Sequence, residues 1–410
     1  MRPIVLLSIT LWPLIASDLT SLLPHAKSNL RVESARLEAQ RTKEQLEQAK
    51  TAYYPTLSAT ALYQKKDKAT AFEPKTVQGL EIGTQINLFD GLRRESTLDA
   101  LHSSIDSAEH SLAQKEQDVL LETITAYYNY FNAQTSLDAI KDKKTELDAQ
   151  VKRFSLLVAN DLATTDILKS LVASKLQADY DEQTQTILLH RNRKNLELLS
   201  GLSIDTLEYK ELSSPQTREV DRSDLKADRS QIETLRHTEG LYTYLPTLSV
   251  QGKHRQMDYN DYDTMGGTNI QPENQNEIIA SLSMTLFDMG SIAKEREQAR
   301  LTTLKAQKLI EYKTKSLQNE ADIAQMSLQA SESAYHAAIA EEEARSEAFG
   351  FIKKRFEAGL VNTTTYLSEL SDLSASRAKA KSARHSLQIA KANLAYAYGT
   401  DLMTLLEEKK

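Results

Sequence analysis

The residue types that carry catalysis or bind metals are scattered in this sequence of 410 residues. No two of its histidines stand at the spacing with which one helix presents a pair of metal ligands, and there is no H-E-x-x-H, G-x-S-x-G or P-loop pattern. Cysteine is absent, which excludes disulfides, thiolate metal sites, cysteine catalysis and a lipidated N-terminal cysteine. We therefore expect no enzymatic activity, no metal and no cofactor. The eight histidines are His25, His102, His110, His190, His237, His254, His336 and His385.

Carboxylates are abundant but balanced by basic residues. The chain has 57 Asp and Glu against 50 Lys and Arg, a net charge of −7, which gives no basis for binding nucleic acid. Acidic runs such as residues 341–343 precede a basic residue, here Arg345, in segments of helical composition. A paired-carboxylate glycosidase site stays open as an alternative, but solvated helix faces explain this pattern better. The aromatic cluster between Tyr127 and Phe131 is likewise attributed to helix packing.

The N-terminus has the pattern of an export signal. Met1 and Arg2 give a basic start, the stretch from Pro3 to Ile15 is apolar except for two residues, and small residues follow. We interpret residues 1–16 as a signal peptide. No later stretch approaches the roughly 20 apolar residues of a membrane helix. Any membrane insertion would therefore have to use β-strands, because only helices and closed barrels satisfy the backbone in lipid.

An internal repeat organises the remaining chain. Three landmarks recur in the same order about 200 residues apart, so we divide the chain into a first repeat at 17–212, a linker at 213–220 and a second repeat at 221–410. Chance similarity between helical sequences does not readily explain matched Pro and Phe-Asp positions. The landmark pairs are Tyr53-Tyr54-Pro55 with Tyr244-Leu245-Pro246, Phe89-Asp90 with Phe287-Asp288, and Thr164-Thr165 with Thr363-Thr364.

Each repeat contains a short region of period-two alternation. Apolar and polar residues alternate from Leu80 to Leu88 and from Ile278 to Leu286, with weaker partners after Leu57 and after Leu248. The sequence thus predicts two β-hairpins, at 53–89 and 244–287, and four strands of a length that spans a membrane when tilted. Four strands cannot close a barrel, and open edges are not tolerated in lipid. Spanning strands would require several chains to share one barrel.

The rest of the chain is predicted to form long helices. Only 12 glycines and 8 prolines occur, and none lies between Leu92 and Leu199. Apolar residues recur every seventh position from Leu98 to Phe154, which predicts a coiled-coil seam. Both long helices should reverse at a tip, near 160 and near 359. Gly359 can take the left-handed conformation that ends a helix, and the Asn160-Asp161 pair occupies the matching place in the first repeat.

The sequence resembles the outer-membrane efflux (TolC-like) proteins, trimeric exit ducts of Gram-negative bacteria. The helix-to-strand junctions AYYPTLSATALY and YLPTLSV and the strand-to-helix junctions INLFDGLRR and MTLFDMGS carry the resemblance. The helical motif AYYNYFNAQTSLDAIK and the tip motif RFEAGLVNTTTYLSEL add to it. The resemblance implies a mainly α fold with a small β part, in which long antiparallel coiled-coil hairpins and two β-hairpins per protomer form a twelve-stranded β-barrel and a periplasmic α-helical barrel.

The resemblance also implies roles at the tips. Relatives often close the periplasmic mouth with rings of Asp after the second tip, where this chain has Thr365 and Ser368. Acidic residues instead stand at Glu369 and Asp372, and Asp166 follows the first tip. These five positions are the candidates for the channel mouth. In a trimer, each acid among them that faces inward becomes a ring of three charges. The candidates for docking an adaptor are Asn160, Asp161 and Leu162 in the first turn and Ala358, Gly359 and Leu360 in the second.

Two functions follow as hypotheses. In the first, a homotrimer in outer-membrane lipid is a passive conduit for a tripartite efflux or type I secretion system, working with a periplasmic adaptor and an inner-membrane pump. In the second, the chain is a soluble periplasmic coiled-coil scaffold or adaptor without a barrel. The alternating strands favour the first, because a soluble scaffold gains nothing from exposing such apolar faces.

Overall fold

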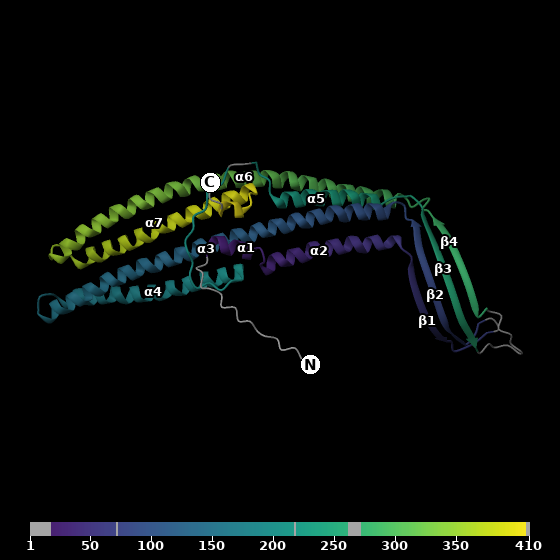
Figure 1. Cartoon of the computed structure of the whole chain (residues 1–410), viewed down its shortest axis with the longest axis horizontal. Helices are drawn as coiled ribbons and strands as arrows, with labels where there is room; N and C mark the ends of the chain where they lie inside the picture. The colour runs from purple at the N-terminus through teal and green to yellow at the C-terminus, as the bar shows by residue number, and fades with distance from the viewer. Residues whose placement is uncertain (1–17, 71–72, 217–218, 261–271, 407–410) are drawn as a thin grey trace, which may run out of the picture. The chain divides into compact units, whose positions relative to one another are not determined.

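Helices dominate the computed structural model, which describes residues 18–70, 73–216, 219–260 and 272–406 (Figure 1). The predicted signal peptide and two residues of the predicted linker lie outside these ranges. The helices are α1 (Leu19–Ala26), α2 (Leu30–Lys50), α3 (Arg93–Ala159), α4 (Thr165–Ser200), α5 (Ser223–Thr238), α6 (Ser291–Glu357) and α7 (Thr363–Tyr398). The strands are β1 (Thr56–Lys65), β2 (Thr76–Phe89), β3 (Thr247–Asn260) and β4 (Asn274–Ser283), and single 3-10 turns stand at Thr51–Tyr53, Glu239–Leu241 and Leu402–Leu406.

The duplication in the sequence has a counterpart in the lengths of the helices. Helices α3 and α6 both have 67 residues, and α4 and α7 both have 36. Two strands precede each long helix, as the sequence predicted. Among the described residues, none of the helices combines the length and apolar character needed to cross a bilayer.

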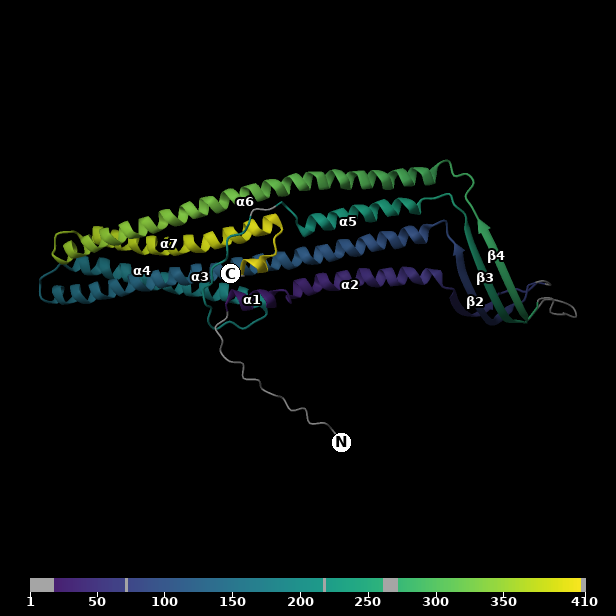
Figure 2. The same cartoon turned by 45° about the horizontal axis from the view of Figure 1, so that its top comes forward.

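The chain forms two compact units that do not follow the two repeats. The first unit contains residues 1–35, 112–223 and 314–410, and the second contains 36–111 and 224–313. Each unit therefore draws on both halves of the sequence, and α3 and α6 contribute to both. In the second unit, α2, α3, α5 and α6 lie side by side (Figure 2).

The second unit contains one antiparallel sheet in the order β1-β2-β3-β4. Directly paired residues of an antiparallel sheet point to the same face. Leu57 pairs with Thr84, Thr84 with Gly252 and Gly252 with Ile278, so the apolar positions of all four strands share one face. The other face is polar, with Glu81 paired to Arg255 and Ser281 paired to Ser249.

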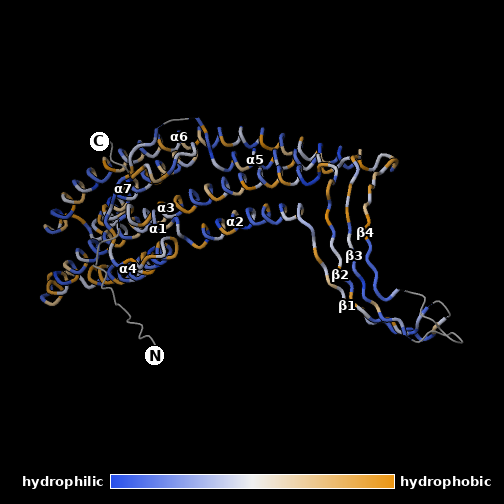
Figure 3. Tube along the Cα trace, turned by 45° about the vertical axis from the view of Figure 1, so that its right-hand side comes forward, coloured by the Kyte–Doolittle hydropathy of each residue, from blue (hydrophilic) through white to orange (hydrophobic). Residues whose placement is uncertain are grey.

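Apolar residues concentrate in the halves of the strands that adjoin the helices, and polar residues in the halves that adjoin the loops (Figure 3). On the apolar face, His254, Gln256, Asn274 and Asn276 occupy the loop side of β3 and β4. The alternation predicted from the sequence is confirmed as a sheet with two chemically different faces.

One strand is shorter than the alternation predicted. The pattern continues to Leu286, but β4 ends at Ser283, which pairs with Thr247, the first residue of β3. Pro246 precedes that residue and has no N–H to donate, so the ladder has no continuation. The apolar residues after Ser283 are exposed and outside the sheet.

Matching turns join strand to helix in the two repeats. Gly91 and Leu92 have φ of 75° and 65°, and Met289 and Gly290 have φ of 57° and 79°. A carboxylate then accepts a backbone N–H of the first helical turn: Arg94 N–H donates to Asp90 in one repeat (2.9 Å), and Ile292 N–H donates to Asp288 in the other (2.8 Å). Acidic side chains stabilise helix N-termini in this way, which explains the repeated Phe-Asp landmark.

The cores of the first unit use the predicted heptad seam. Val119, Ala126, Ala133, Leu147 and Phe154 of α3 are all buried at seven-residue intervals or multiples of them. The first two belong to a core with α1, α4 and α7, and the last two belong to a core near the tips. The seven-residue period of the sequence is thus a packing seam.

Candidate functional site

The second tip is a glycine turn with a side-chain cap. Gly359 has φ of 72°, Leu360 N–H donates to the carbonyl of Arg355 (2.9 Å), and Gly359 N–H donates to that of Phe356 (3.0 Å). This pair of bonds is the Schellman ending of a helix. Asn362 then accepts the backbone N–H of Thr365 (2.8 Å) and begins α7. The left-handed conformation predicted for Gly359 is confirmed.

The first tip reaches the same backbone geometry with different residues. Asp161 has φ of 58°, its N–H donates to Val158 O (3.1 Å), and Leu162 N–H donates to Leu157 O (2.8 Å). Asn160 adds a side-chain bond to Leu156 O (2.7 Å). Thr164 is the N-cap residue of α4, but its side chain makes no capping bond.

The two turns share one groove of about 750 Å³. Of the predicted docking residues, Leu162, Gly359 and Leu360 line it, and Asp166 lines it as well. Leu162 and Leu360 are 74% and 68% exposed. The groove has a largely apolar lining from which Leu162 and Leu360 are exposed to a partner, and its lining has no cluster of acids or histidines that could hold a metal.

An ionic network lies behind the groove. The hydroxyl of Tyr366 (α7), which is fully buried, donates to Glu146 (α3) at 2.5 Å, and Lys353 (α6) donates to the same carboxylate at 2.6 Å. Burial raises the pKa of Glu146, but the hydrogen bonds from Lys353, Tyr366 and Gln150 outweigh burial and leave that pKa below its usual value. The network ties three helices together near the tips.

Aromatic packing surrounds this network. The Tyr366 ring stacks on Phe356 with centroids 4.3 Å apart, and Phe356 stacks on Phe154 at 5.4 Å. Phe349 lies against the Tyr366 ring at 5.8 Å. Burial and the adjacent carboxylate raise the pKa of Tyr366, so its hydroxyl stays protonated and remains a donor. We call Glu146, Lys353, Tyr366 and these three phenylalanines the tip cluster.

The acids after the second tip contact a single cation. Arg345 of α6 lies 3.6 Å from Glu369 and 3.1 Å from Asp372 of α7. Because the two acids are three residues apart, they occupy one face of α7. Thr365 and Ser368 are exposed beside them. The mouth candidates after the second tip therefore comprise two uncharged residues, Thr365 and Ser368, and two acids that both pair with Arg345.

Asp166 is exposed at the start of α4 and is bound locally. A hydrogen bond with Thr164 and backbone N–H groups of the first helical turn hold the pKa of this carboxyl below its usual range. Negative charge at a helix N-terminus is stabilised by these N–H groups. The geometry of Asp166 shows that it stabilises the first turn of α4.

Farther along the first unit, an irregular segment crosses α3 and α7. We call residues 208–213 the belt. Tyr127 and Tyr128 donate their hydroxyls to the carbonyls of Glu208 and Lys210, and Gln388 of α7 accepts the N–H of Leu212 (2.8 Å). These bonds fix the belt through its backbone.

Under the belt lies a buried histidine. His385 of α7 is surrounded by the rings of Tyr128, Phe131 and Tyr209, and its Nδ1 lies 2.7 Å from Asn132 Oδ1. Burial, with Arg384 and Lys381 nearby, lowers the pKa of His385 to about 4. The imidazole is therefore neutral at neutral pH. We call His385 and its three ring neighbours the belt cluster.

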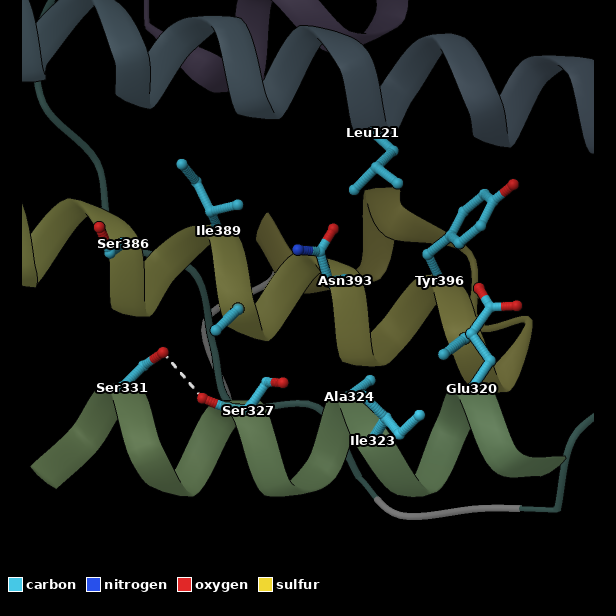
Figure 4. Close-up of a pocket in the computed structure, with 12 residues that line it drawn as sticks. Leu121, Glu320, Ile323, Ala324, Ser327, Ser331, Ser386, Ile389, Asn393 and Tyr396 are labelled. Atoms are coloured by element: carbon cyan, nitrogen blue, oxygen red, sulfur yellow. Dashed lines mark hydrogen bonds between the residues drawn. The ribbon is translucent and has the colours of Figure 1, made fainter. Parts of the chain in front are cut away.

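A second groove of about 460 Å³ runs between α6 and α7, with Leu121 of α3 at one side (Figure 4). Small side chains face it from both helices, among them Ser327, Ser331 and Ser386. Ser331 donates to the backbone of Ser327 (2.8 Å). Its lining has few charged groups, so the groove is a loosely filled helix seam.

Sequence reasoning missed the groups that join the helices. Glu146, Lys353 and Arg345 belong to ordinary charged helical stretches, and nothing in their spacing shows which helix they face. Tyr366 stands inside the tip motif and could have been noticed as a large residue at a seam position. For His385, the sequence offered only the residue type, and nothing around it predicted that it would be buried among aromatic rings.

The comparisons identify one family. A family model described as "Outer membrane efflux protein" matches residues 25–155 and 222–400, which is more than half of the chain. The interruption between the matched ranges contains the belt and the predicted linker. No curated protein sequence matches this chain.

Solved structures share the fold. The CmeC outer membrane channel of Campylobacter jejuni aligns with a TM-score of 0.78 at 15% identity over 93% of this chain and 85% of its own. The open-state MtrE outer membrane channel of Neisseria gonorrhoeae gives 0.76 at 16% identity, over 94% and 89%. The outer membrane protein VceC of Vibrio cholerae gives 0.74 at 15% identity, over 94% and 96%. At these identities the likeness establishes the fold.

Proposed function

This chain belongs to the outer membrane efflux protein family, and we propose that it acts as a homotrimer whose three sheets close one barrel in outer-membrane lipid. The protein is an outer-membrane exit duct with a large periplasmic part, and it is a passive conduit, not an enzyme. The hypothesis of a soluble periplasmic scaffold is rejected, because the chain's family is located in the outer membrane. The energy for export then comes from an inner-membrane pump, which we propose as a partner together with a periplasmic adaptor.

The observation that supports this proposal best is the sheet. Its four strands carry one apolar and one polar face, and within the described residues β1 and β4 each have a paired strand on one side only. A membrane barrel needs lipid-facing apolar positions, lumen-facing polar positions and no open edge. Three copies supply twelve strands and pair each β1 with a neighbouring β4. One symmetric assembly therefore meets all three requirements.

The two faces can be tested against each other. Ile82 lies on the apolar face, and Gln85 lies on the polar face of the same strand. Ile82→Arg should cost about 2–4 kcal/mol near the bilayer midplane and lower the amount of heat-resistant trimer in outer-membrane fractions. Gln85→Arg is the matched control and should assemble normally. Equal amounts of trimer from both variants would refute the assignment of the faces.

We further propose that the two tip turns dock the adaptor. The shared groove and the exposed Leu162 and Leu360 support this, since apolar side chains in a concave surface suit a protein partner. Gly359→Val should abolish export and leave trimers intact, because a β-branched residue is strained at φ of 72°. Thr364→Val, in the same groove but without the strained backbone, is the control. Full export by Gly359→Val would count against docking at the tips.

For the channel mouth we propose a ring made by Glu369 and Asp372, with Arg345 as their counter-charge. Their shared contact supports treating the two acids as one element. Removing both, as Glu369→Gln with Asp372→Asn, should reduce cation preference in planar-bilayer recordings at low salt. Thr365→Ala with Ser368→Ala is the control pair. Unchanged selectivity in the acidic double variant would instead leave Thr365 and Ser368 as an uncharged mouth.

A further inference from the structure

The apolar face of the sheet becomes polar on the loop side of β3 and β4 (Figure 3). Near the helices this face carries Val250 on β3, and Leu282 and Ile278 on β4. From His254 and Asn276 to the loop, every strand residue on the same face is polar and exposed. We call five of these residues the outer patch: His254, Gln256, Asp258, Asn274 and Asn276.

The boundary between apolar and polar residues crosses the strands obliquely. Leu57 of β1 and Ile278 of β4 stand in one row of the sheet. From this row the apolar residues of β1 continue toward the loop to Ala61, whereas those of β4 continue toward the helices to Leu282. The last apolar position thus lies four residues farther toward the loop on β1 than on β4. This offset is about 13 Å along the strands over about 14 Å across them, a slope of about 40°.

This slope matches the edge of a membrane. Strands of a membrane barrel tilt by about 35–45°, so the horizontal edge of the hydrocarbon layer must cut the rows of the sheet at that angle. Tyr63, the first residue on this face of β1 after Ala61, is 67% exposed, and tyrosine is enriched at membrane interfaces. The outer patch therefore begins where hydrocarbon ends, in the layer of lipid headgroups.

The chemistry of the outer patch differs from that of the opposite face of the same strands. The opposite face carries the full charges of Lys253, Arg255 and Glu277, and Arg255 donates to Glu81 of β2 at 2.6 Å. The outer patch has three amides, one imidazole and one carboxylate, but no Lys or Arg. A phosphate ligand would be expected to meet basic residues. The outer patch instead suits neutral hydroxyl groups.

The amides of the outer patch stand in two adjacent rows. His254 pairs with Asn276, and the imidazole Nδ1 lies 2.7 Å from Asn276 Oδ1, which leaves the amide NH₂ of Asn276 for another partner. Gln256 pairs with Asn274, and neither side chain hydrogen-bonds to any residue that the structure describes. Each amide offers donors and an acceptor in one plane, and each hydroxyl of a sugar both donates and accepts. Neighbouring amides can therefore bind neighbouring hydroxyls.

We infer that the outer patch binds the sugar part of a glycolipid in the outer leaflet. The patch continues the lipid-facing side of the sheet, so lipid headgroups lie against it and cargo in the lumen does not. In a trimer each copy supplies one such site. This inference rests on the proposed membrane barrel and names the class of lipid that binds near its loops.

Two lipids separate sugar from phosphate as the ligand. A diglucosyl diacylglycerol has sugars and no phosphate, whereas phosphatidic acid has a phosphate and no sugar. Native mass spectrometry of the detergent-solubilised trimer should show at least tenfold tighter retention of the diglucosyl lipid. Equal retention of the two lipids, or tighter retention of phosphatidic acid, would refute a sugar site.

Variants of the two faces locate the site. Gln256→Ala with Asn274→Ala should weaken retention of the diglucosyl lipid about tenfold, because two amides lose their hydrogen bonds, and should leave heat-resistant trimers intact. Gln251→Ala with Gln275→Ala, on the opposite face of the same strands, is the matched control and should retain the lipid normally. Unchanged retention in the first variant, or equal loss in both, would place the lipid elsewhere and refute the inference.

A cross-linking experiment tests the site in intact cells. Gln256→p-benzoylphenylalanine, irradiated in the outer membrane, should form an adduct with lipopolysaccharide, the glycolipid of Gram-negative outer leaflets. The same amino acid at Gln275 should form none, because that position faces the lumen. Absence of the adduct at Gln256 would refute the inference.

The outcomes distinguish this site from the proposed function. Trimers that reach the outer membrane but neither retain the diglucosyl lipid nor form the adduct would refute the site and leave the duct standing. A chain that forms no trimer in the outer membrane would refute the duct and the site together.

Discussion

The belt cluster and the tip cluster are both aromatic cores of the first unit, but they are held together by different chemistry. At the belt, Tyr127 and Tyr128 bond to backbone carbonyls, and His385 is neutral. At the tip, Tyr366 bonds to a carboxylate that also binds Lys353. The belt therefore depends mainly on buried rings and backbone bonds, with one half-exposed ion pair between Glu211 and Arg384 (2.7 Å), whereas the tip depends on a carboxylate whose bonds pH can alter.

This difference indicates which part of the unit is suited to move. Breaking the bonds from the tyrosine hydroxyls to the belt carbonyls would require the whole belt to move. Ion pairs between side chains on separate helices can instead re-form with other partners or with water. A duct that opens at its mouth needs the second kind of contact near the tips and the first kind farther away. The following changes test that contrast.

The largest effect is expected at the belt. Tyr128→Ala removes a fully buried ring and should destabilise the first unit by about 3–5 kcal/mol, as measured by thermal unfolding of the detergent-solubilised protein. Tyr128→Phe keeps the ring and should cost only about 1–2 kcal/mol through the lost bond to Lys210 O. Similar losses from both variants would show that the hydroxyl, and not packing, dominates the belt.

The second effect is the response of the belt to acid. The pKa of His385 is about 4 in the folded protein, against an ordinary value of 6.5. Between these values the unfolded chain binds a proton that the folded chain does not. The contribution of His385 to the free energy of unfolding is therefore fully present above pH 6.5. It falls as the pH drops toward 4, by up to about 3 kcal/mol.

The matched variant is His385→Gln, which cannot titrate and can still bond to Asn132. Its unfolding midpoint in urea should be lower at neutral pH and should change little between pH 6.5 and 4. A wild-type midpoint that does not vary across this window would contradict a neutral, buried imidazole.

The tip should respond to acid at lower pH. The pKa of Glu146 is below its ordinary value of 4.5, so its contribution is present above pH 4.5 and is lost as the pH falls through the lowered pKa. Glu146→Gln should cost about 1–3 kcal/mol, since it weakens the bonds from Lys353 and Tyr366. Hydrogen exchange should show the loss around the tips and not at the belt. Loss of protection at the belt would contradict the separation of the two clusters.

The smallest effect is expected from the half-exposed ion pairs that Arg345 forms with Glu369 and Asp372, the proposed mouth residues. Arg345→Gln should change stability by less than about 1 kcal/mol, because half-exposed pairs are screened by water and salt. Its effect should vanish in high salt, where the effect of Tyr128→Ala should persist. A large, salt-independent loss would place Arg345 in the structural core instead.

Much of the fold could be predicted from the sequence because its signals are local or periodic. The seven-residue period predicted the seam through Val119 and Leu147, the alternation predicted the strands, and the glycine predicted the second turn. The first turn was harder, since Asp161 adopts positive φ without being glycine. The end of β4 depended on Pro246, the residue just before the neighbouring strand β3, and alternation within β4 could not reveal it.

The sequence by itself determined the duplicated elements, the two faces of the sheet and the positions of the tips, because each follows from residue spacing along one segment. Only the tertiary structure decided which charges meet across segments: Glu146 with Lys353 and Tyr366, and Arg345 with Glu369 and Asp372. It also decided that the compact units cut across the repeats. The physical reason is that a helix of 67 residues presents charges on every side, and only its packing selects which of them lose water and gain a partner.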